Sequence, residues 1–196
     1  MAGTAKTCLA VYSALKALNE KKIGEVIYVR QAVESSSYNL GYLPGALEEK
    51  MNPYLQPLVD KLNEFIRPQE RDELVKSEKI RGIAVGHLRG LSINAAYIIC
   101  DESQNLTTQD LLLIMTRLGK FSKLICIGDL KQPDIKNSGF ERIYNLFDNE
   151  ESKKHGIQTF KFGKEDIMRN PVLSYIIEQF EMLPSNGNGN GNGYSK

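Results

Sequence analysis

Residues 97–105 read Y-I-I-C-D-E-S-Q-N, an apolar run that ends in two adjacent carboxylates. A run this short, rich in β-branched residues and followed by polar ones, predicts a buried strand. Open α/β sheets bind their ligands beyond the carboxyl ends of the strands, where Asp101 and Glu102 would lie. We therefore expect Asp101 to hold a Mg²⁺ ion and Glu102 to polarise an attacking water. A strand that merely ends in solvated acids is the alternative that this stretch leaves open.

A second predicted strand ends in the same way. Residues 123–128 read K-L-I-C-I-G, which is typical of a buried strand, and the polar stretch G-D-L-K-Q follows at 128–132. Two strands that deliver polar groups at their carboxyl ends favour a functional site more than either strand does alone.

The start of the chain, M-A-G-T-A-K-T, approximates the phosphate-binding pattern G-x-x-x-x-G-K-[ST]. Gly3, Lys6 and Thr7 fit this pattern, whereas Ala5 replaces the second glycine. The backbone of Gly3, Thr4 and Ala5 would direct N–H groups at phosphate oxygens, in front of a helix whose amino end faces the anion. Lys6 would reach the β- and γ-phosphates, and the Thr7 hydroxyl would ligate Mg²⁺.

The helix that this loop requires is predicted by apolar residues at three- and four-residue spacing between Cys8 and Leu18. An ordinary amino-terminal helix with a Lys-Thr pair is the alternative. A phosphate loop follows a buried strand, so we expect that strand and a glycine just upstream of Met1. The native chain would then begin earlier, or this copy would lack a strand that is central to the sheet.

The rest of the chain alternates predicted strands and helices. Strands are expected at 25–30 and 157–160, and helices from 53 to 65, from 108 to 118, from 138 to 147 and from 171 onward. Residues 107–110 approximate a capping box. We interpret 67–81 as a solvated helix or loop, 82–90 as a glycine-bearing connection and 148–156 as a charged loop. This alternation predicts an α/β fold with a mostly parallel sheet covered on both faces.

Composition limits the function classes. The 196 residues predict one domain over 1–184 and an Asn/Gly-rich tail without stable structure over 185–196. A net charge of +1 argues against a strongly polyanion-binding surface but leaves room for a local basic stripe. No apolar run approaches the ~20 residues of a membrane span. The three cysteines form no C-x-x-C pair, which favours reduced thiols and a cytoplasmic location.

Several stretches together resemble the PhoH-like proteins, phosphate-starvation-associated P-loop ATPases related to the core of superfamily 1 helicases. In the family's order, from residue 2 to about 183, they are A-G-T-A-K-T, Y-L-P-G-A-L-E-E-K-M-N-P-Y-L-Q-P-L, R-G, I-I-C-D-E-S-Q-N, T-R-L-G, I-G-D-L-K-Q-P-D-I, S-G-F and D-I-M-R-N-P. The sequence is most similar to family forms seen in bacteriophages. The resemblance implies a RecA-like P-loop NTPase fold that uses ATP and Mg²⁺.

By position, the resemblance implies a role for each matching residue. Lys6 and Thr7 correspond to the phosphate-loop pair, Asp101 to the magnesium-binding acid and Glu102 to the water-activating acid. Gln104 would also face the site.

The resemblance extends to the second strand end and beyond it. Gln132, with Asp129, matches the motif that senses the γ-phosphate, on a strand that in related ATPases lies between the phosphate-loop strand and the acidic strand. Arg169 matches the family's arginine before a proline, and it would complete a site in its own subunit or in a neighbouring one. The departures are Ala5 for glycine, Ser103 for alanine, and the absent first strand and glycine.

These observations give three functional hypotheses. The leading one is Mg²⁺-dependent ATP hydrolysis by a cytoplasmic protein, in the host cytoplasm if the source is viral. The second couples hydrolysis to RNA or to another single-stranded nucleic acid. A homo-oligomeric ring is a separate expectation, since arginines of the Arg169 type often act across subunits. The alternative is a nucleotide-binding or assembly module that does not hydrolyse ATP.

Overall fold

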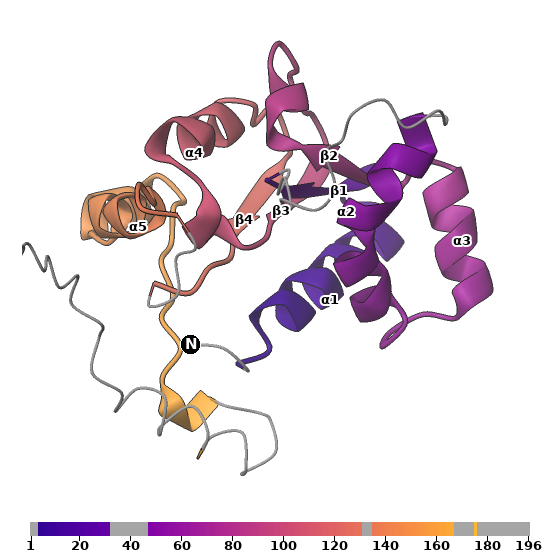
Figure 1. The fold of residues 1–196 in the computed structure, drawn as a ribbon, viewed down its shortest axis with the longest axis horizontal. Coiled ribbons are helices and arrows are strands. Elements are labelled where there is room, and N and C mark those ends of the chain that lie inside the picture. Colours follow the sequence, from indigo (N-terminus) through magenta and orange to yellow (C-terminus); the bar gives the residue numbers. More distant parts are fainter. Residues whose placement is uncertain (1–3, 32–46, 131–134, 167–174, 176–196) are drawn as a thin grey trace, which may run out of the picture.

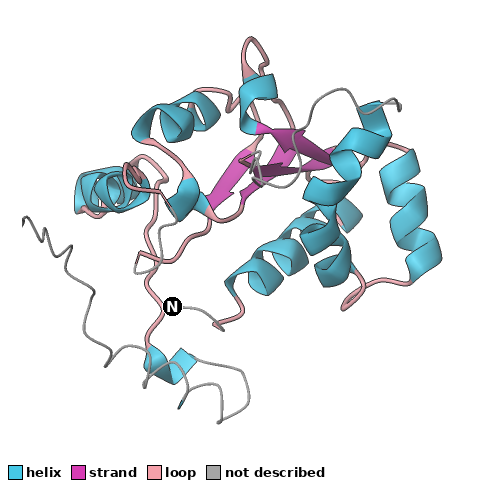
Figure 2. Ribbon diagram, viewed as in Figure 1, coloured by secondary structure: helices cyan, strands magenta, loops and turns pink. Residues whose placement is uncertain are grey.

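The computed structural model describes residues 4–31, 47–130, 135–166 and 175. Within these residues, the strands form one parallel sheet flanked by helices (Figures 1 and 2). The strands are β1 (Glu25–Arg30), β2 (Ile80–Ala84), β3 (Ala96–Cys100) and β4 (Lys123–Cys126), in the spatial order β2-β1-β3-β4. The predicted α/β class with a parallel sheet is confirmed, and it is consistent with a P-loop NTPase fold.

The helices lie on both sides of this sheet (Figure 1). They are α1 (Lys6–Asn19), α2 (Leu47–Leu62), α3 (Pro68–Lys76), α4 (Thr108–Met115), α5 (Phe140–Phe147) and α6 (Glu150–Lys154). Single turns of 3₁₀ helix occur at Val85–Leu88, Ser103–Asn105 and Lys164–Asp166. Among the described helices, none is long and apolar enough to cross a bilayer.

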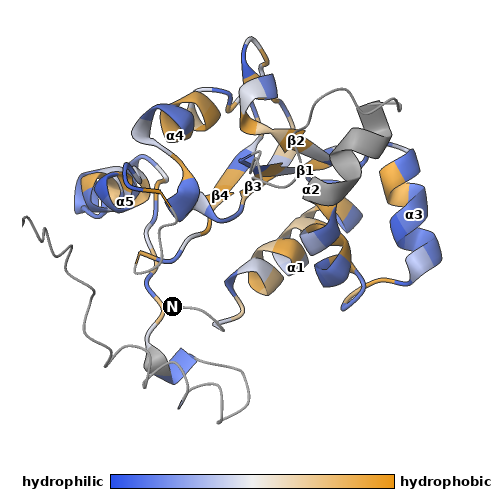
Figure 3. Ribbon diagram, viewed as in Figure 1, coloured by the Kyte–Doolittle hydropathy of each residue, from blue (hydrophilic) through white to orange (hydrophobic). Residues whose placement is uncertain are grey.

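The core consists of two apolar layers, one on each face of the sheet. Successive side chains of a strand point to opposite faces, so β1 and β3 contribute to both layers. One layer packs the sheet against α1 and α2 through Ala10, Val11, Ala14, Val26, Tyr28, Leu58, Leu62, Ile80, Tyr97 and Ile99. The other packs it against α4 through Ile27, Val29, Ile98, Cys100, Leu106, Leu111 and Ile114. By contrast, α3 has no buried residue and is largely blue in Figure 3.

The parallel register places the carboxyl ends of β1, β3 and β4 next to one another. Val29 of β1 is paired with Cys100 of β3, and Cys100 is paired with Cys126 of β4. Pairing continues one step past β4, where the Ile127 N–H donates to the Cys100 carbonyl at 2.8 Å. The residues after β3 and β4 therefore leave the sheet side by side at one edge.

Strand β2 was not predicted, because its sequence I-R-G-I-A lacks a clear alternation and contains a glycine. The structure shows why the glycine is there. A Cβ at Gly82 would lie 2.7 Å from Leu55 Cδ2 on α2, so the bare backbone lets that helix pack closely. The interpretation of residues 82–90 as a connection is thus wrong for its first part, and a 3₁₀ turn fills 85–88.

Other elements and boundaries also differ from the predictions. Residues 157–160 are not a strand, and the charged stretch 148–156 is not a plain loop, since it contains α6 with Asn149 as its cap. Helix α2 begins at 47 rather than at 53, and α4 ends at 115 rather than at 118. The helix predicted from 171 and the tail lie outside the described residues, apart from Tyr175.

The capping box predicted at the start of α4 is confirmed. The Thr107 hydroxyl accepts from the Asp110 backbone N–H at 3.2 Å, and the Asp110 carboxylate accepts from the Thr107 N–H at 3.1 Å. These bonds satisfy N–H groups that the helix itself leaves without partners.

We expect Thr107→Ala to lower the free energy of unfolding by about 1 kcal/mol, because it removes the cap acceptor. Urea titration followed by circular dichroism measures the change. Thr116→Ala is the matched control, since its hydroxyl bonds only to carbonyls and a neighbouring side chain at the exposed end of the same helix. Equal effects of the two substitutions would contradict a capping role.

Candidate functional site

The site begins at the amino end of α1. Ala5 is the residue before the helix and has a left-handed backbone with φ 54° and ψ 20°. An L-residue in this conformation costs about 1–3 kcal/mol, which explains why the phosphate-loop pattern has glycine here. Thr4 is buried, and its hydroxyl accepts from Lys6 Nζ at 3.0 Å. Ala5 itself gives the first turn of α1 no side-chain cap, and N–H groups at the amino end of a helix are a favourable place for an anion.

Helix α1 meets the acidic strand end through one side-chain contact. The Thr7 hydroxyl donates to Asp101 Oδ1 at 3.2 Å, although the two residues are 94 positions apart. The Lys-Thr pair and the acid pair are therefore on the same side of the sheet, as the sequence predicted.

Asp101 is almost fully buried and is held by hydroxyl groups. It is 7% exposed, and its second oxygen, Oδ2, accepts from the Tyr28 hydroxyl at 2.6 Å. Burial, followed by the charge of Asp101, raises the pKa of the Tyr28 phenol well above its usual range. The phenol therefore stays protonated and acts as a donor at any ordinary pH.

The oxygen donors around Asp101 suit a hard divalent cation. Mg²⁺ prefers one or two carboxylates with hydroxyl, water and phosphate oxygens, which matches Thr7 Oγ1 beside Asp101 Oδ1. Among the described residues, no Lys or Arg nitrogen lies within 4.0 Å of the Asp101 carboxylate, so its buried charge has no cationic partner there. Within that part of the chain, no group of three His, Cys, Asp or Glu residues could form a closed cage.

Glu102 stands at the tip of the strand end in a left-handed conformation, with φ 53° and ψ 38°. Its side chain is 48% exposed and is held from two directions. Gln104 Nε2 donates to its carboxylate at 2.6 Å, and Arg30 Nη2 lies 3.9 Å from the other oxygen. The carboxylate is thus fixed but still open to solvent.

Gln104 also joins the two strand ends. Its carbonyl oxygen accepts from the Asp129 backbone N–H at 3.0 Å, while its amide holds Glu102. The loop after β4 fits tightly here, because a Cβ at Gly128 would lie 2.6 Å from the Phe140 ring of α5 and 3.0 Å from the Gln104 backbone nitrogen. Glu102, Gln104 and Asp129 therefore form one connected group.

The structure brings together most of the residues that the sequence proposed. Those that meet at this edge of the sheet are Thr4, Ala5, Lys6, Thr7, Asp101, Glu102, Gln104 and Asp129. Gly3, Gln132 and Arg169 lie outside the described residues.

Sequence reasoning missed Tyr28 and Arg30, which both contact the acid pair. In the sequence alone, both residues are simply parts of the strand predicted at 25–30. Their i, i+2 spacing near the end of β1 places them on one face of a strand that pairs with β3. Two long side chains with polar ends, two residues apart near the carboxyl end of a strand, could have indicated this contact with the acid pair.

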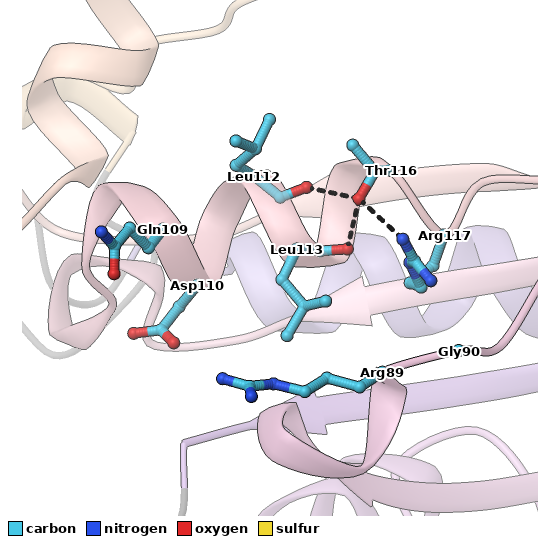
Figure 4. A pocket seen from close by; sticks show the side chains of 8 residues that line it. All are labelled: Arg89, Gly90, Gln109, Asp110, Leu112, Leu113, Thr116 and Arg117. Carbon is cyan, nitrogen blue, oxygen red and sulfur yellow. Dashed lines mark hydrogen bonds between the residues drawn. The ribbon is translucent and has the colours of Figure 1, made fainter.

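A separate hollow of about 490 Å³ runs along α4 (Figure 4). Its lining comes from residues 89–90 and from the stretch 109–117, with Arg89 extended beneath the helix and Arg117 at the helix end. It shares no residue with the group around Asp101.

Comparison with known proteins identifies the family. A family model described as PhoH-like protein matches residues 1–181. PhoH-like proteins of Synechocystis sp. and Bacillus subtilis are 37% and 36% identical over 183 residues, which cover 92% of this chain and 54% and 56% of those proteins. The PhoH-like protein of Mycobacterium tuberculosis is 33% identical over 190 residues, or 95% of this chain and 53% of that protein.

The chain spans about half the length of these relatives. The match nevertheless runs through both strand ends and through the start of α1, the segments that build the group around Asp101. This chain belongs to the PhoH-like protein family.

Proposed function

We propose that this chain binds ATP together with Mg²⁺ and hydrolyses the terminal phosphoanhydride bond. The observation that carries the proposal is the 3.2 Å hydrogen bond from Thr7 to Asp101, because it joins the start of α1 to the tip of β3. Phosphoryl transfer needs positioned phosphates, neutralised charge and an oriented water, and it needs little covalent help from the protein. The described residues offer a candidate for each of these tasks.

The proposed roles follow from position. The N–H groups of the first turn of α1, with Lys6, would bind the phosphates, and Thr7 with Asp101 would hold Mg²⁺. Bound there, Mg²⁺ supplies positive charge next to the phosphate oxygens. Glu102, exposed at the strand tip and held by Gln104, would orient the attacking water.

Two further residues belong to the proposal on the family resemblance. Gln132 would contact the γ-phosphate beside Asp129. Arg169 would neutralise charge in its own site or in that of a neighbouring copy, as in a ring.

Removing the divalent cation should abolish hydrolysis. We expect phosphate release from ATP to fall to the level of a protein-free control when excess EDTA is added, because Lys6 and Arg169 cannot replace the charge that the metal places on the phosphates. Release of inorganic phosphate is measured before chelation, after it, and after excess Mg²⁺ is restored. The restored sample is the control for irreversible damage, and hydrolysis that continues in EDTA would contradict the proposal.

Coupling to single-stranded nucleic acid is part of the proposal and has its own test. Hydrolysis would be stimulated by single-stranded RNA, and the stimulation would weaken as salt rises because phosphate contacts release counterions. Nucleotide binding without any hydrolysis would instead favour the assembly-module alternative.

A further inference from the structure

Tyr28 places a phenol where a buried strand usually carries only apolar atoms. Its side chain lies in the layer between the sheet and α1, and the residue is 1% exposed. A buried phenol needs a hydrogen-bond partner, and Tyr28 finds it in Asp101 Oδ2 at 2.6 Å. The contact reaches from the middle of β1 across to the end of β3.

Asp101 is attached to β1 by its backbone as well. Its N–H donates to the Val29 carbonyl at 3.2 Å, one residue after Tyr28. The parallel register pairs Tyr28 with Ile99, so the phenol reaches two positions further along β3 to meet the carboxylate. Strand β1 thus fixes both the main chain and the side chain of Asp101.

The two carboxylate oxygens of Asp101 have different hydroxyl donors. Tyr28 donates to Oδ2, and Thr7 donates to Oδ1. Because the two donors come from different elements, β1 and α1, rotation of the carboxylate about its terminal torsion would break both bonds. The bond to Tyr28 is the shorter, and it holds Oδ1 toward Thr7.

A phenol suits this task because it is neutral. A lysine or arginine at position 28 would also donate to Oδ2, but its charge would cancel the charge that attracts a cation. The phenol orients the carboxylate through its hydrogen bond to Oδ2 and adds no positive charge beside it. Phenylalanine would fill the same space and orient nothing.

We propose that Tyr28 is a positioning residue for the cation site: its hydroxyl holds Asp101 Oδ2, so that Oδ1 faces Thr7 and the Mg²⁺ ion. This inference rests on the proposed function. It assigns a task to a residue that does not itself contact nucleotide or metal.

The test is Tyr28→Phe, with Tyr97→Phe as the matched control. Tyr97 is a second buried tyrosine in the same layer, and its hydroxyl pairs with Ser13 rather than with Asp101. We expect Tyr28→Phe to weaken Mn²⁺ binding in the presence of a non-hydrolysable ATP analogue on the order of tenfold, as loss of an outer hydrogen bond to a metal ligand does. Nucleotide affinity in EDTA should not change, and Tyr97→Phe should leave both values at wild type.

Titration of Mn²⁺ by electron paramagnetic resonance gives the metal affinity, and thermal unfolding compares the two variants. A similar loss of thermal stability in both, with metal affinity unchanged in Tyr28→Phe, would show a purely structural tyrosine and overturn the inference. Wild-type protein that binds nucleotide without any metal dependence would overturn the proposed function itself, and the inference with it.

The wild-type protein provides a second measurement if Tyr28→Phe does not fold. A buried, hydrogen-bonded phenol proton exchanges slowly with water and can be observed by proton NMR. Its resonance is assigned through correlations with the ring protons of the same tyrosine. We expect Mg²⁺ with the ATP analogue to shift the Tyr28 hydroxyl resonance and to leave that of Tyr97 in place. An unmoved Tyr28 resonance at saturating metal would overturn the inference.

Discussion

Glu102→Gln should bind ATP as tightly as the wild-type chain and lose ATP turnover by at least about 100-fold, the usual range for removing a general base. The amide has the same size and can keep a hydrogen bond to Gln104, so the strand tip should hold its shape. Unlike the carboxylate, it cannot take up a proton from the water that Glu102 is proposed to orient. The phosphates would be bound by α1 and Lys6, which the substitution does not touch.

Phosphate release under single-turnover conditions measures the loss, and calorimetric titration with ATP checks the binding. Glu141→Gln, on the exposed side of α5, is the matched control and should leave both quantities unchanged. Turnover by Glu102→Gln at the wild-type rate would remove Glu102 from the mechanism, whatever its effect on stability.

Lys6→Ala should lower the affinity for ATP by about 10- to 100-fold, because a charge-assisted hydrogen bond to phosphate contributes about 1.5–3 kcal/mol. In the structure, Lys6 Nζ donates to the neutral Thr4 hydroxyl, an acceptor that a phosphate oxygen would readily replace. Loss of the side chain therefore removes the cation that would bind the phosphates.

Calorimetric titration with ATP and Mg²⁺ measures the loss, and circular dichroism checks that α1 is retained. Lys16→Ala is the control, since Lys16 lies exposed in the last turn of the same helix. Equal ATP affinities for the two variants would contradict a phosphate-binding role for the amino end of α1.

Much of the fold was predictable where the chain forms complete, strongly patterned elements. The strand at 25–30 was predicted with its bounds, and those at 97–100 and 123–128 to within one or two residues. The pattern failed where tertiary contacts decide the structure. In β2, a glycine weakens the strand pattern but admits Leu55, and at 157–160 the alternation of apolar and polar residues found no partner strand.

The acidic residues of the candidate site could be predicted from the sequence, but the hydrogen bonds that hold them in place could not. Polar residues after buried strands marked Asp101 and Glu102, because the sheet geometry gathers strand ends at one edge. The hydrogen bond from Tyr28 was not predictable, because it depends on which strands are neighbours and in which register. The spacing of Tyr28 and Arg30 marks a shared strand face, but it does not tell which strand lies beside that face or in which register.

The amide of Gln104 makes the acid at the tip of β3 and the backbone after β4 mechanically dependent on each other. A shift of Asp129 either pulls Gln104 along, and Glu102 with it, or breaks the 3.0 Å bond between them. The position of Asp129, just after β4, therefore influences the orientation of the Glu102 side chain. A ligand that moved one strand end would therefore also change the geometry at the other end, through the side chain of Gln104.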